Sequence, residues 1–302
     1  MNFENVLVTG GAGRLGRYVV AELTRHCRVS VLDRAGDAAG RVDVPGDVLD
    51  LEPLRAAVRG RDAVIHLAAI DSSVPAPPAV VFDTNVRGTW NVLQAAHEAG
   101  VRRVIICSSS AAAGLDYTNP EMPPLYLPID EDHPLRPSQT YGLSKQLNEV
   151  IAQSFGRRRR LEVICLRPAW VMSADAVRRI AAEHRGSVPA ALPGRQREPL
   201  PLLRAYVDPE DVARAFRLTL ELQDVRYPVF ILTAADTFEP IPTLTHIEKV
   251  YGRLPEVRKP EIYARNPNAT AYDISRAREI LGWSPSADWA QVSARFLADG
   301  GG

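Results

Sequence analysis

Short apolar runs alternate with longer amphipathic segments over the first two thirds of the chain. The runs are rich in Val, Ile and Leu, which is typical of strands covered on both faces, and they predict strands over 6–9, 29–33, 41–47, 63–67, 103–108 and 161–167. The segments between them predict helices over 14–26, 51–59, 79–99 and 140–155. Because strand–helix–strand units wind into parallel sheets, we expect an α/β protein with a doubly wound parallel sheet.

Beyond residue 168 the alternation loosens. A stretch over 187–201 is rich in Pro, Gly and Arg and predicts an irregular excursion. Residues 207–222 then look helical and 229–232 look like a strand, and short helices are expected over 243–251, 275–281 and 288–297. The domains that we expect are a first domain over 1–167, to whose sheet 205–234 return, and a small C-terminal lobe made of 168–204 and 235–302.

The composition is that of an ordinary globular protein. Of 302 residues, 46% are hydrophobic and 24% charged, and Lys and Arg together number 36, as do Asp and Glu. Nucleic acid and anionic membranes are therefore not expected as main partners. The sequence contains neither an apolar run of about 18 residues nor an N-terminal signal core, so we expect a cytoplasmic protein. Its three cysteines are far apart and predict reduced thiols, and no ligand cluster predicts a metal site.

A glycine-rich turn joins the first strand to the first helix. Gly10, Gly13 and Gly16 are spaced by three at this point. A Cβ at these positions would block the tight turn, the approach of a pyrophosphate or the close packing of the helix. The start of the helix offers free N–H groups and a positive dipole end to that pyrophosphate. The turn therefore predicts a dinucleotide site, the alternative being a turn of purely structural value.

The second strand ends on an acid that bears on the choice of dinucleotide. Asp33 follows Gly16 by 17 residues, where a carboxylate accepts hydrogen bonds from the ribose hydroxyls of an adenosine. The same carboxylate repels a 2′-phosphate, so NAD is favoured over NADP. Arg34 and Arg14 would partly reverse this preference if either turned toward the ribose. Without a cofactor, Asp33 is an ordinary solvated acid at a strand end.

A tyrosine and a lysine four residues apart begin a helical stretch after a proline-rich segment over 115–138, which predicts a long surface loop. Tyr141 and Lys145 share one face of the helix, so the ammonium favours the phenolate and makes the tyrosine a better base at neutral pH. The chain has 33 arginines and only three lysines, and an ammonium can also reach the ribose of a nicotinamide nucleotide. Taken alone, the spacing also fits an ordinary amphipathic helix.

With these motifs in place, the sequence resembles the extended short-chain dehydrogenase/reductase family, also called the NAD-dependent epimerase/dehydratase family. The resemblance covers nearly the whole chain and depends on ten motifs in family-like order. They are Thr9 to Gly16, Asp33, Gly46-Asp47-Val48, His66-Leu67-Ala68-Ala69, Asn85-Val86-Arg87-Gly88-Thr89, Ser108-Ser109-Ser110, Tyr141 to Lys145, Arg167-Pro168, Tyr206-Val207-Asp208 with Asp211-Val212-Ala213, and Leu281-Gly282-Trp283-Ser284-Pro285.

The resemblance implies a Rossmann-type NAD domain and a catalytic set of serine, tyrosine and lysine, here Tyr141 and Lys145. Counting forward from Gly100-Val101 and back from Gly114 favours Ser109 as the serine, with Ser110 as the alternative. Its hydroxyl would hydrogen-bond the substrate oxygen while the tyrosine exchanges that oxygen's proton. The residues expected to bind the cofactor are Gly10, Gly13, Arg14, Leu15, Gly16, Asp33, Arg34, Asp47, Val48, Leu67, Ala68, Ala69, Asn85, Tyr141, Lys145, Pro168 and Val171.

Two departures narrow the chemistry within the family. Relatives that eliminate water from nucleotide sugars carry an Asp-Glu pair directly after the catalytic hydroxyl residue, where this chain has Ser110-Ala111, so a dehydratase is not expected. Nucleotide-sugar enzymes also tend to carry an Asn shortly after the sixth strand, where this chain reads Pro168 to Met172. Three arginines could still hold a diphosphate: Arg195, Arg197 and Arg204.

The compact C-terminal part looks more like the branch that contains uronate dehydrogenases, which oxidise a free sugar. In that branch an arginine about a dozen residues beyond the sixth strand's arginine binds the substrate carboxylate. Arg179 stands twelve residues after Arg167, beside Arg178. The alternative is a solvated helical arginine. The other residues expected to line the substrate pocket are Ser72 or Ser73, Ser110 and Trp170.

The sequence therefore predicts an NAD-dependent oxidoreductase that acts on a small sugar-like substrate, with a free sugar or uronic acid favoured. The alternatives are a nucleotide-sugar epimerase and, in another class, a non-catalytic protein that senses NAD(P). The resemblance also implies a homodimer formed through the helices over 79–99 and 140–155. Leu143, Leu147 and Ile151 give an apolar stripe there, which otherwise faces the sheet.

Overall fold

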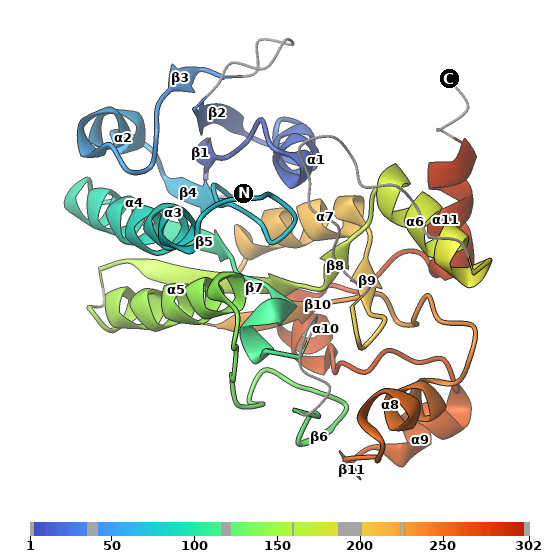
Figure 1. Ribbon diagram of the computed structural model, residues 1–302. Helices are drawn as coiled ribbons and strands as arrows, with labels where there is room; N and C mark the ends of the chain where they lie inside the picture. Colours follow the sequence, from blue (N-terminus) through green and yellow to red (C-terminus); the bar gives the residue numbers. More distant parts are fainter. Residues whose placement is uncertain are drawn as a thin grey trace.

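The computed structural model describes residues 3–34, 42–115, 122–158, 160–186, 201–223, 225 and 228–298. Within these ranges, seven parallel strands form one sheet in the order β10-β7-β5-β4-β1-β2-β3 (Figure 1). The strands are β1 Asn5–Thr9, β2 Arg28–Asp33, β3 Val44–Pro45, β4 Ala63–His66, β5 Arg103–Cys107, β7 Glu162–Pro168 and β10 Val229–Leu232. The sheet confirms the predicted α/β class.

Helices cover both faces of this sheet, because successive strand residues point to opposite sides. In β1 the side chains of Val6 and Val8 pack in one core and that of Leu7 in the other, and all three are fully buried. The first core also contains side chains of α1 and α7, and the second those of α2, α4 and α5. The bounds of these helices are α1 Arg14–Leu23, α7 Pro209–Thr219, α2 Leu51–Val58, α4 Gly88–Glu98 and α5 Thr140–Arg157.

The direction of winding reverses between β1 and β4. The chain adds β2 and β3 on one side of β1, and β4, β5, β7 and β10 on the other. His66 joins the two strands at this point: its Nδ1 lies 2.7 Å from Thr9 Oγ1, and its Nε2 lies 3.0 Å from Thr89 Oγ1. Burial lowers the pKa of His66 to about 3, so the junction is uncharged at neutral pH. In doubly wound sheets, ligands bind at such a switch point, outside the carboxyl ends of the strands.

The predicted helix over 79–99 is interrupted. Helix α3 (Pro78–Phe82) passes through a π-helical turn, η1 (Asp83–Arg87), before α4 begins. The Asn85 side chain points inward there and binds the Ile70 backbone, accepting from the N–H at 2.8 Å and donating to the carbonyl at 3.0 Å. These bonds tie the turn to the loop after β4, a tertiary contact that helical periodicity does not reveal.

The predicted strand over 41–47 is also shorter than expected. Only Val44–Pro45 pair with β2, at the edge of the sheet. Pro45 has no N–H for further pairing, which suits an edge position. Arg41 lies outside the described residues.

After β7 the structure contains a helix that the sequence pattern did not predict. Helix α6 (Ala174–His184) begins after Ser173, whose Oγ accepts from the Ala176 N–H at 3.2 Å. It packs against α11 (Trp289–Ala298) in a small third core. The excursion predicted over 187–201 lies outside the described residues except for residue 201, and so do Arg195 and Arg197.

The remaining elements are short. Strand β6 pairs with β11, so the loop predicted over 115–138 contains a strand. Strand β9 pairs with β8 and includes Val207, so the helix predicted over 207–222 starts later, as α7. Figure 1 shows α8, α9 and β11 on the side of the molecule away from β3. The bounds are η2 Ser110–Ala113, β6 Tyr126–Leu127, β8 Trp170–Val171, β9 Tyr206–Val207, α8 Thr243–Tyr251, β11 Glu256–Val257, α9 Pro260–Arg265 and α10 Ser275–Leu281.

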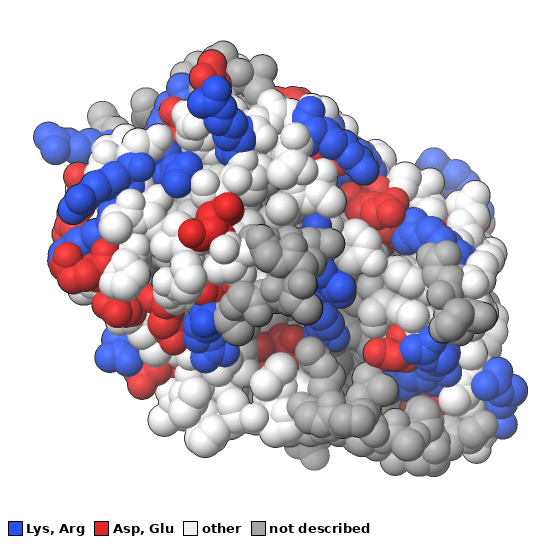
Figure 2. Space-filling view, turned by 90° about the horizontal axis from the view of Figure 1, so that it is seen from above, with Lys and Arg blue, Asp and Glu red and all other residues white. Residues whose placement is uncertain are grey.

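The surface charge, the helix lengths and the cysteines also bear on the sequence predictions. Among the described residues, no helix combines the length and the apolar character required to cross a membrane. Acidic and basic side chains are interspersed over the face shown in Figure 2. Cys27, Cys107 and Cys165 are free thiols, as the sequence predicted, although only Cys165 is fully buried.

Candidate active site

A cleft of about 940 Å³ opens at the carboxyl ends of the central strands. Its lining comes from the glycine turn, the ends of β2, β5 and β7, the loop after β4, and the helices α5 and α6. Of the residues predicted for catalysis, cofactor or substrate that the structure describes, all but Asn85 and Arg204 line the cleft. Those lining it are Ser109, Tyr141 and Lys145; Gly10, Gly13, Arg14, Leu15, Gly16, Asp33, Arg34, Asp47, Val48, Leu67, Ala68, Ala69, Pro168 and Val171; and Ser72, Ser73, Ser110, Trp170 and Arg179.

Two glycines of the turn have no room for a side chain. Gly10 adopts a φ of +75°, and a Cβ there would lie 2.6 Å from the backbone nitrogen of Ala68. A Cβ on Gly16 would lie 2.3 Å from the carbonyl oxygen of Gly10. The glycine turn and the loop after β4 are therefore in direct backbone contact, and both line the cleft.

Helix α1 begins without a side-chain cap. Its N-cap is Gly13, and its first turn contains no acidic residue. By contrast, the side chains of Asp50 and Asp208 cap α2 and α7. The first turn of α1 lines the cleft, so its N–H groups and positive dipole end are directed to a ligand there. This arrangement fits the pyrophosphate of a dinucleotide.

Asp33 is held by backbone groups at the end of β2. Its Oδ2 accepts from the Ala12 N–H at 3.1 Å, and its Oδ1 accepts from the Arg34 N–H at 2.8 Å. A carboxylate has lone pairs left after two such bonds, so this side chain can still accept from ribose hydroxyls. Together with Asp47 and Val48, which also line the cleft, Asp33 fits the adenosine of NAD.

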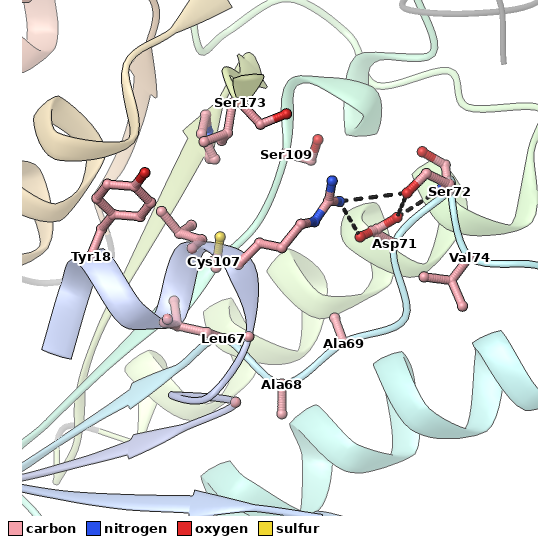
Figure 3. A pocket seen from close by; sticks show the side chains of 18 of the residues that line it. Tyr18, Leu67, Ala68, Ala69, Asp71, Ser72, Val74, Cys107, Ser109 and Ser173 are labelled. Carbon is pink, nitrogen blue, oxygen red and sulfur yellow. Dashed lines mark hydrogen bonds and ion pairs between the residues drawn. The ribbon is translucent and has the colours of Figure 1, made fainter. Parts of the chain in front are cut away.

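The Arg14 side chain links two walls of the cleft. Its Nη2 lies 2.6 Å from Asp71 Oδ2 and 3.5 Å from Ser73 Oγ, so it reaches from the glycine turn to the loop after β4. Figure 3 shows Asp71 and Ser72 in this loop. Asp71 in turn accepts from the Ser73 N–H at 2.8 Å. The sequence prediction included Arg14 but missed Asp71, whose one signal is its place in the polar stretch after the fourth strand.

Tyr141 and Lys145 lie one turn apart at the start of α5. The buried Lys145 donates from Nζ to the Cys107 carbonyl at 2.8 Å, and the same Nζ lies 5.5 Å from the centre of the Tyr141 ring. Burial lowers the pKa of Lys145, while Cys107, Asp71 and Glu149 are among the groups that oppose this shift. The geometry therefore places the predicted cation beside the predicted base.

Ser109 and Ser110 follow β5. Ser109 Oγ accepts from the Ala111 N–H at 3.1 Å and so caps the short turn η2, which leaves the hydroxyl proton available for another acceptor. Ser109 is half-buried and appears among the cleft side chains in Figure 3, whereas Ser110 is 5% exposed. Both serines line the cleft, and the exposure favours Ser109 as the one that meets a substrate.

The segment after β7 supplies the wall predicted for the substrate. The guanidinium carbon of Arg179 lies 5.6 Å from the centre of the Trp170 ring, and both side chains line the cleft. The neighbouring Arg178 lines it too but forms an ion pair with Asp175. Lining residues that the sequence prediction missed include Met172, Ser173, Tyr18 and Phe296. Phe296 has no sequence signal, because only folding brings α11 against α6.

Two residues predicted to bind ligands have other partners. Arg204 does not line the cleft; its Nε lies 3.1 Å from Glu239 Oε2. Asn85 is fully buried, and besides its two bonds to the Ile70 backbone it donates to Ser144 Oγ at 3.0 Å. Asn85 therefore ties the loop after β4 to α5 instead of contacting the cleft.

A doubly wound sheet, an uncapped helix at a glycine turn, an acid at the end of β2 and a Tyr–Lys pair define a Rossmann-type, nicotinamide-dependent enzyme. The family model for the NAD-dependent epimerase/dehydratase family matches residues 6–230, and the chain belongs to this family. No group of three or more potential metal-ligand side chains was found in the described part of the chain.

Two kinds of sugar-converting enzyme are among the relatives. L-arabinose 1-dehydrogenase (NAD(P)(+)) of Haloferax volcanii is 34% identical over 185 residues, covering 57% of this chain and 69% of the relative. Uronate dehydrogenase of Pseudomonas syringae pv. tomato is 30% identical over 173 residues, covering 55% and 58%. UDP-glucose 4-epimerase of Streptomyces lividans is 31% identical over 317 residues, covering 95% and 93%.

A solved structure also resembles nearly the whole chain. The crystal structure of a short-chain dehydrogenase/reductase superfamily protein from Agrobacterium tumefaciens with bound NAD has a TM-score of 0.71 and 26% identity. The match covers 98% of this chain and 95% of that chain. The predicted Rossmann-type fold and the predicted family are thus confirmed.

Proposed function

We propose that the protein is an NAD-dependent dehydrogenase that transfers hydride between the nicotinamide and a carbinol or carbonyl carbon of a small sugar. A free sugar or a uronic acid is the favoured substrate. The observation that carries this proposal is the composition of the cleft beside Tyr141 and Lys145. A serine and an alanine, Ser110 and Ala111, occupy the place of an eliminating acid pair, and Trp170 and Arg179 line the cleft.

Each side chain of the catalytic set has a distinct part. Ser109 donates a hydrogen bond to the substrate oxygen, and Tyr141 removes that oxygen's proton during oxidation and returns it during reduction. Lys145 stabilises the phenolate through its charge and remains anchored on the Cys107 carbonyl. Bound NAD supplies the hydride acceptor. The uncapped start of α1 and Asp33 would hold its pyrophosphate and adenosine ribose.

The substrate is proposed to lie between the first domain and the lobe formed by 168–204 and 235–302. Arg179 is the candidate for a carboxylate, because it lines the cleft beside Trp170 and a guanidinium can bind a carboxylate through two parallel hydrogen bonds. Replacing Arg179 with Met should raise KM for a uronic acid and leave KM for a neutral sugar nearly unchanged. Arg178→Met is the matched control on the same helix. Equal effects of Arg179→Met on both substrates would contradict this role.

The screen that tests the main proposal offers NAD with free sugars, uronic acids and nucleotide sugars and follows the absorbance of NADH. A dehydrogenase accumulates NADH in proportion to the sugar consumed, and Tyr141→Phe abolishes the signal. Conversion of a UDP-sugar to its epimer without net NADH would overturn the proposal in favour of an epimerase. The observation that favours this second candidate is the alignment of the Streptomyces epimerase over 95% of this chain.

A third candidate is a non-catalytic sensor of NAD, since a Rossmann fold alone does not establish catalysis. The juxtaposed Tyr141 and Lys145 speak for an enzyme. A sensor would bind NAD in calorimetry and show no turnover with any member of the sugar panel.

We further propose a homodimer through α3, α4 and α5. Large apolar side chains are exposed on all three helices, among them Phe82 at 42%, Trp90 at 43% and Val150 at 57%. Of the predicted stripe, Leu143 is exposed, whereas Ile151 packs partly against the sheet core. Trp90→Glu should yield a monomer in analytical ultracentrifugation. Ile280→Glu, on α10, changes an equally apolar exposed position and should leave the dimer intact; a wild-type monomer would refute the proposal.

A further inference from the structure

A buried ion pair joins α5 to β7, one helical turn after Lys145. Glu149 follows Lys145 by four residues on α5, and Arg167 is in β7. Arg167 Nε lies 2.8 Å from Glu149 Oε1, and its Nη2 lies 2.7 Å from Oε2, so the two side chains meet at both oxygens. Their side chains are only 4% and 7% exposed. The catalytic helix is thus fixed to β7 one turn beyond the lysine.

The same carboxylate also holds the end of β5. Ser108 Oγ donates to Glu149 Oε1 at 2.5 Å, and the preceding carbonyl, that of Cys107, accepts from Lys145. Two successive residues at the end of β5 are therefore bound by side chains from two successive turns of α5. The next residue along the chain is Ser109, so these two bonds restrict the backbone that leads directly into it.

Arg167 carries this connection to the substrate wall. The next residue is Pro168, which lines the cleft and leads into Trp170. Arg167 Nη1 also donates to the Glu131 carbonyl at 3.2 Å, and Glu131 Oε1 accepts from the Ile231 N–H at 2.9 Å. One carboxylate, that of Glu149, therefore connects the segments that carry the lysine, the serine and the substrate wall.

Stability alone gives a weak reason for such a group. Removing two charges from water costs free energy that the ion pair only partly recovers, and well-packed apolar residues in place of a buried pair are often as stable or more stable. A fully satisfied polar network does, however, fix side-chain geometry more tightly than apolar contact does. The three bonds to Glu149 are directional and converge on the segments that must meet in the reaction.

We propose that Glu149 is a positioning residue for the hydride-transfer site: it fixes Ser109 relative to Tyr141 and Lys145 through its bonds to Ser108 and Arg167. It touches neither substrate nor cofactor in this role. The inference rests on the proposed function for the identity of the reacting groups.

The test separates positioning from stability. Glu149→Leu/Arg167→Met removes the pair and keeps an apolar filling, and Ser108→Ala removes one bond with a minimal change in volume. The matched control is Arg103→Met/Glu162→Leu, which removes an ion pair at the other end of β5 and β7. For each variant the melting temperature, the kcat and KM for the sugar, the Kd for NADH, and hydrogen–deuterium exchange are measured.

Positioning predicts that Glu149→Leu/Arg167→Met melts close to wild type, binds NADH nearly unchanged and has a kcat lower by about tenfold to a hundredfold, since a displacement near 1 Å can cost that much. Exchange should rise at 107–113 and 141–148. Ser108→Ala should show the same pattern more weakly, and the control should show neither effect. Wild-type exchange in those segments in both test variants would overturn the inference, as would wild-type kcat.

If Glu149→Leu/Arg167→Met does not fold, the kcat and the exchange of Ser108→Ala test the positioning role on their own, because this variant keeps the ion pair. If the wild-type protein turns over no sugar, the proposed function fails. The exchange measurement needs no substrate and still tests the inference in that case.

Discussion

A buried arginine forms an ion pair with a glutamate at each end of the paired strands β5 and β7, and the two ion pairs differ in what they hold. At the amino end, Arg103 and Glu162 are opposite each other in the sheet, with Arg103 Nε 2.8 Å from Glu162 Oε2. Arg103 also donates to the Leu222 carbonyl at 2.9 Å, just beyond the C-terminal end of α7. At the carboxyl end, Glu149 lies on the helix that carries Lys145 and binds both Arg167 and Ser108. The same kind of ion pair therefore fastens a helix end at the amino end of the strands and aligns reacting groups at the carboxyl end.

The largest fall in kcat should come from replacing Tyr141, the proposed base at the carboxyl end of the strands. Replacing Tyr141 with Phe removes the proton exchange and should lower kcat by roughly 10²- to 10⁴-fold, the usual contribution of general acid–base catalysis. The Kd for NAD, measured by calorimetry, should change little because the ring remains. Turnover near the wild-type rate would show that the cleft does not use this tyrosine.

Exchanging the cation at the same end should have the next largest effect. Lys145→Arg keeps the charge, but the planar guanidinium cannot occupy the compact site beside the Cys107 carbonyl. Steady-state kinetics should show kcat reduced by about tenfold to a hundredfold. The control Lys249→Arg changes a lysine on α8, outside the cleft lining, and should be kinetically silent.

A change at the amino end should instead affect stability. Glu162→Gln leaves the buried Arg103 with its carbonyl partners and no counter-charge, which should lower the free energy of unfolding by about 1–3 kcal/mol. Urea denaturation at constant m-value measures this loss. The kcat should remain within about twofold of wild type, on the argument that this end touches no reacting group. A large fall in kcat would erase the distinction between the two ends.

The smallest effect is expected at the rim of the cleft, where the contact between Arg14 and Asp71 is partly exposed. The two side chains are 54% and 35% exposed, so solvent screens their ion pair. Asp71→Asn should weaken NAD binding by about fivefold at most, since exposed pairs contribute up to about 1 kcal/mol. The dissociation rate of NADH, followed by fluorescence, should rise accordingly, and the effect should fade at high salt. An unchanged rate would mean that the contact does not act on the cofactor.

The sequence predicted the parts of the fold that follow from local pattern. The apolar runs that became β1, β2, β4, β5 and β10 were each located within a residue or two, because burial on both faces leaves a continuous apolar signal. The glycine turn and the Tyr–Lys spacing located most of the cleft for the same reason: they are local in the chain. Helix α6 was missed because Ala174 to His184 packs on α11, a partner over a hundred residues away.

The parts of the candidate site that escaped prediction depend on long-range partners. Asp71 has a role only because Arg14, 57 positions earlier, reaches it. Glu149 continues the four-residue spacing of Tyr141 and Lys145, a signal that was present but had no meaning before β7 placed Arg167 beside it. The predictions for Arg204 and Asn85 were wrong for the opposite reason. Both side chains can bind a ligand, but in the folded protein they bind Glu239 and Ser144 instead.

The π turn at Asp83–Arg87 has a consequence for how this protein tolerates insertions and deletions. A π-helical turn contains one residue more than an α-helical turn, so deleting one residue there would give α-helical hydrogen bonding throughout and leave α3 and α4 in register. The deletion would make the helix more regular, yet it would pull Asn85 away from Ile70 and release the loop that carries Ala68 and Asp71. Sequence length in this helix is therefore constrained by the rim of a cleft to whose lining the helix contributes only Thr84.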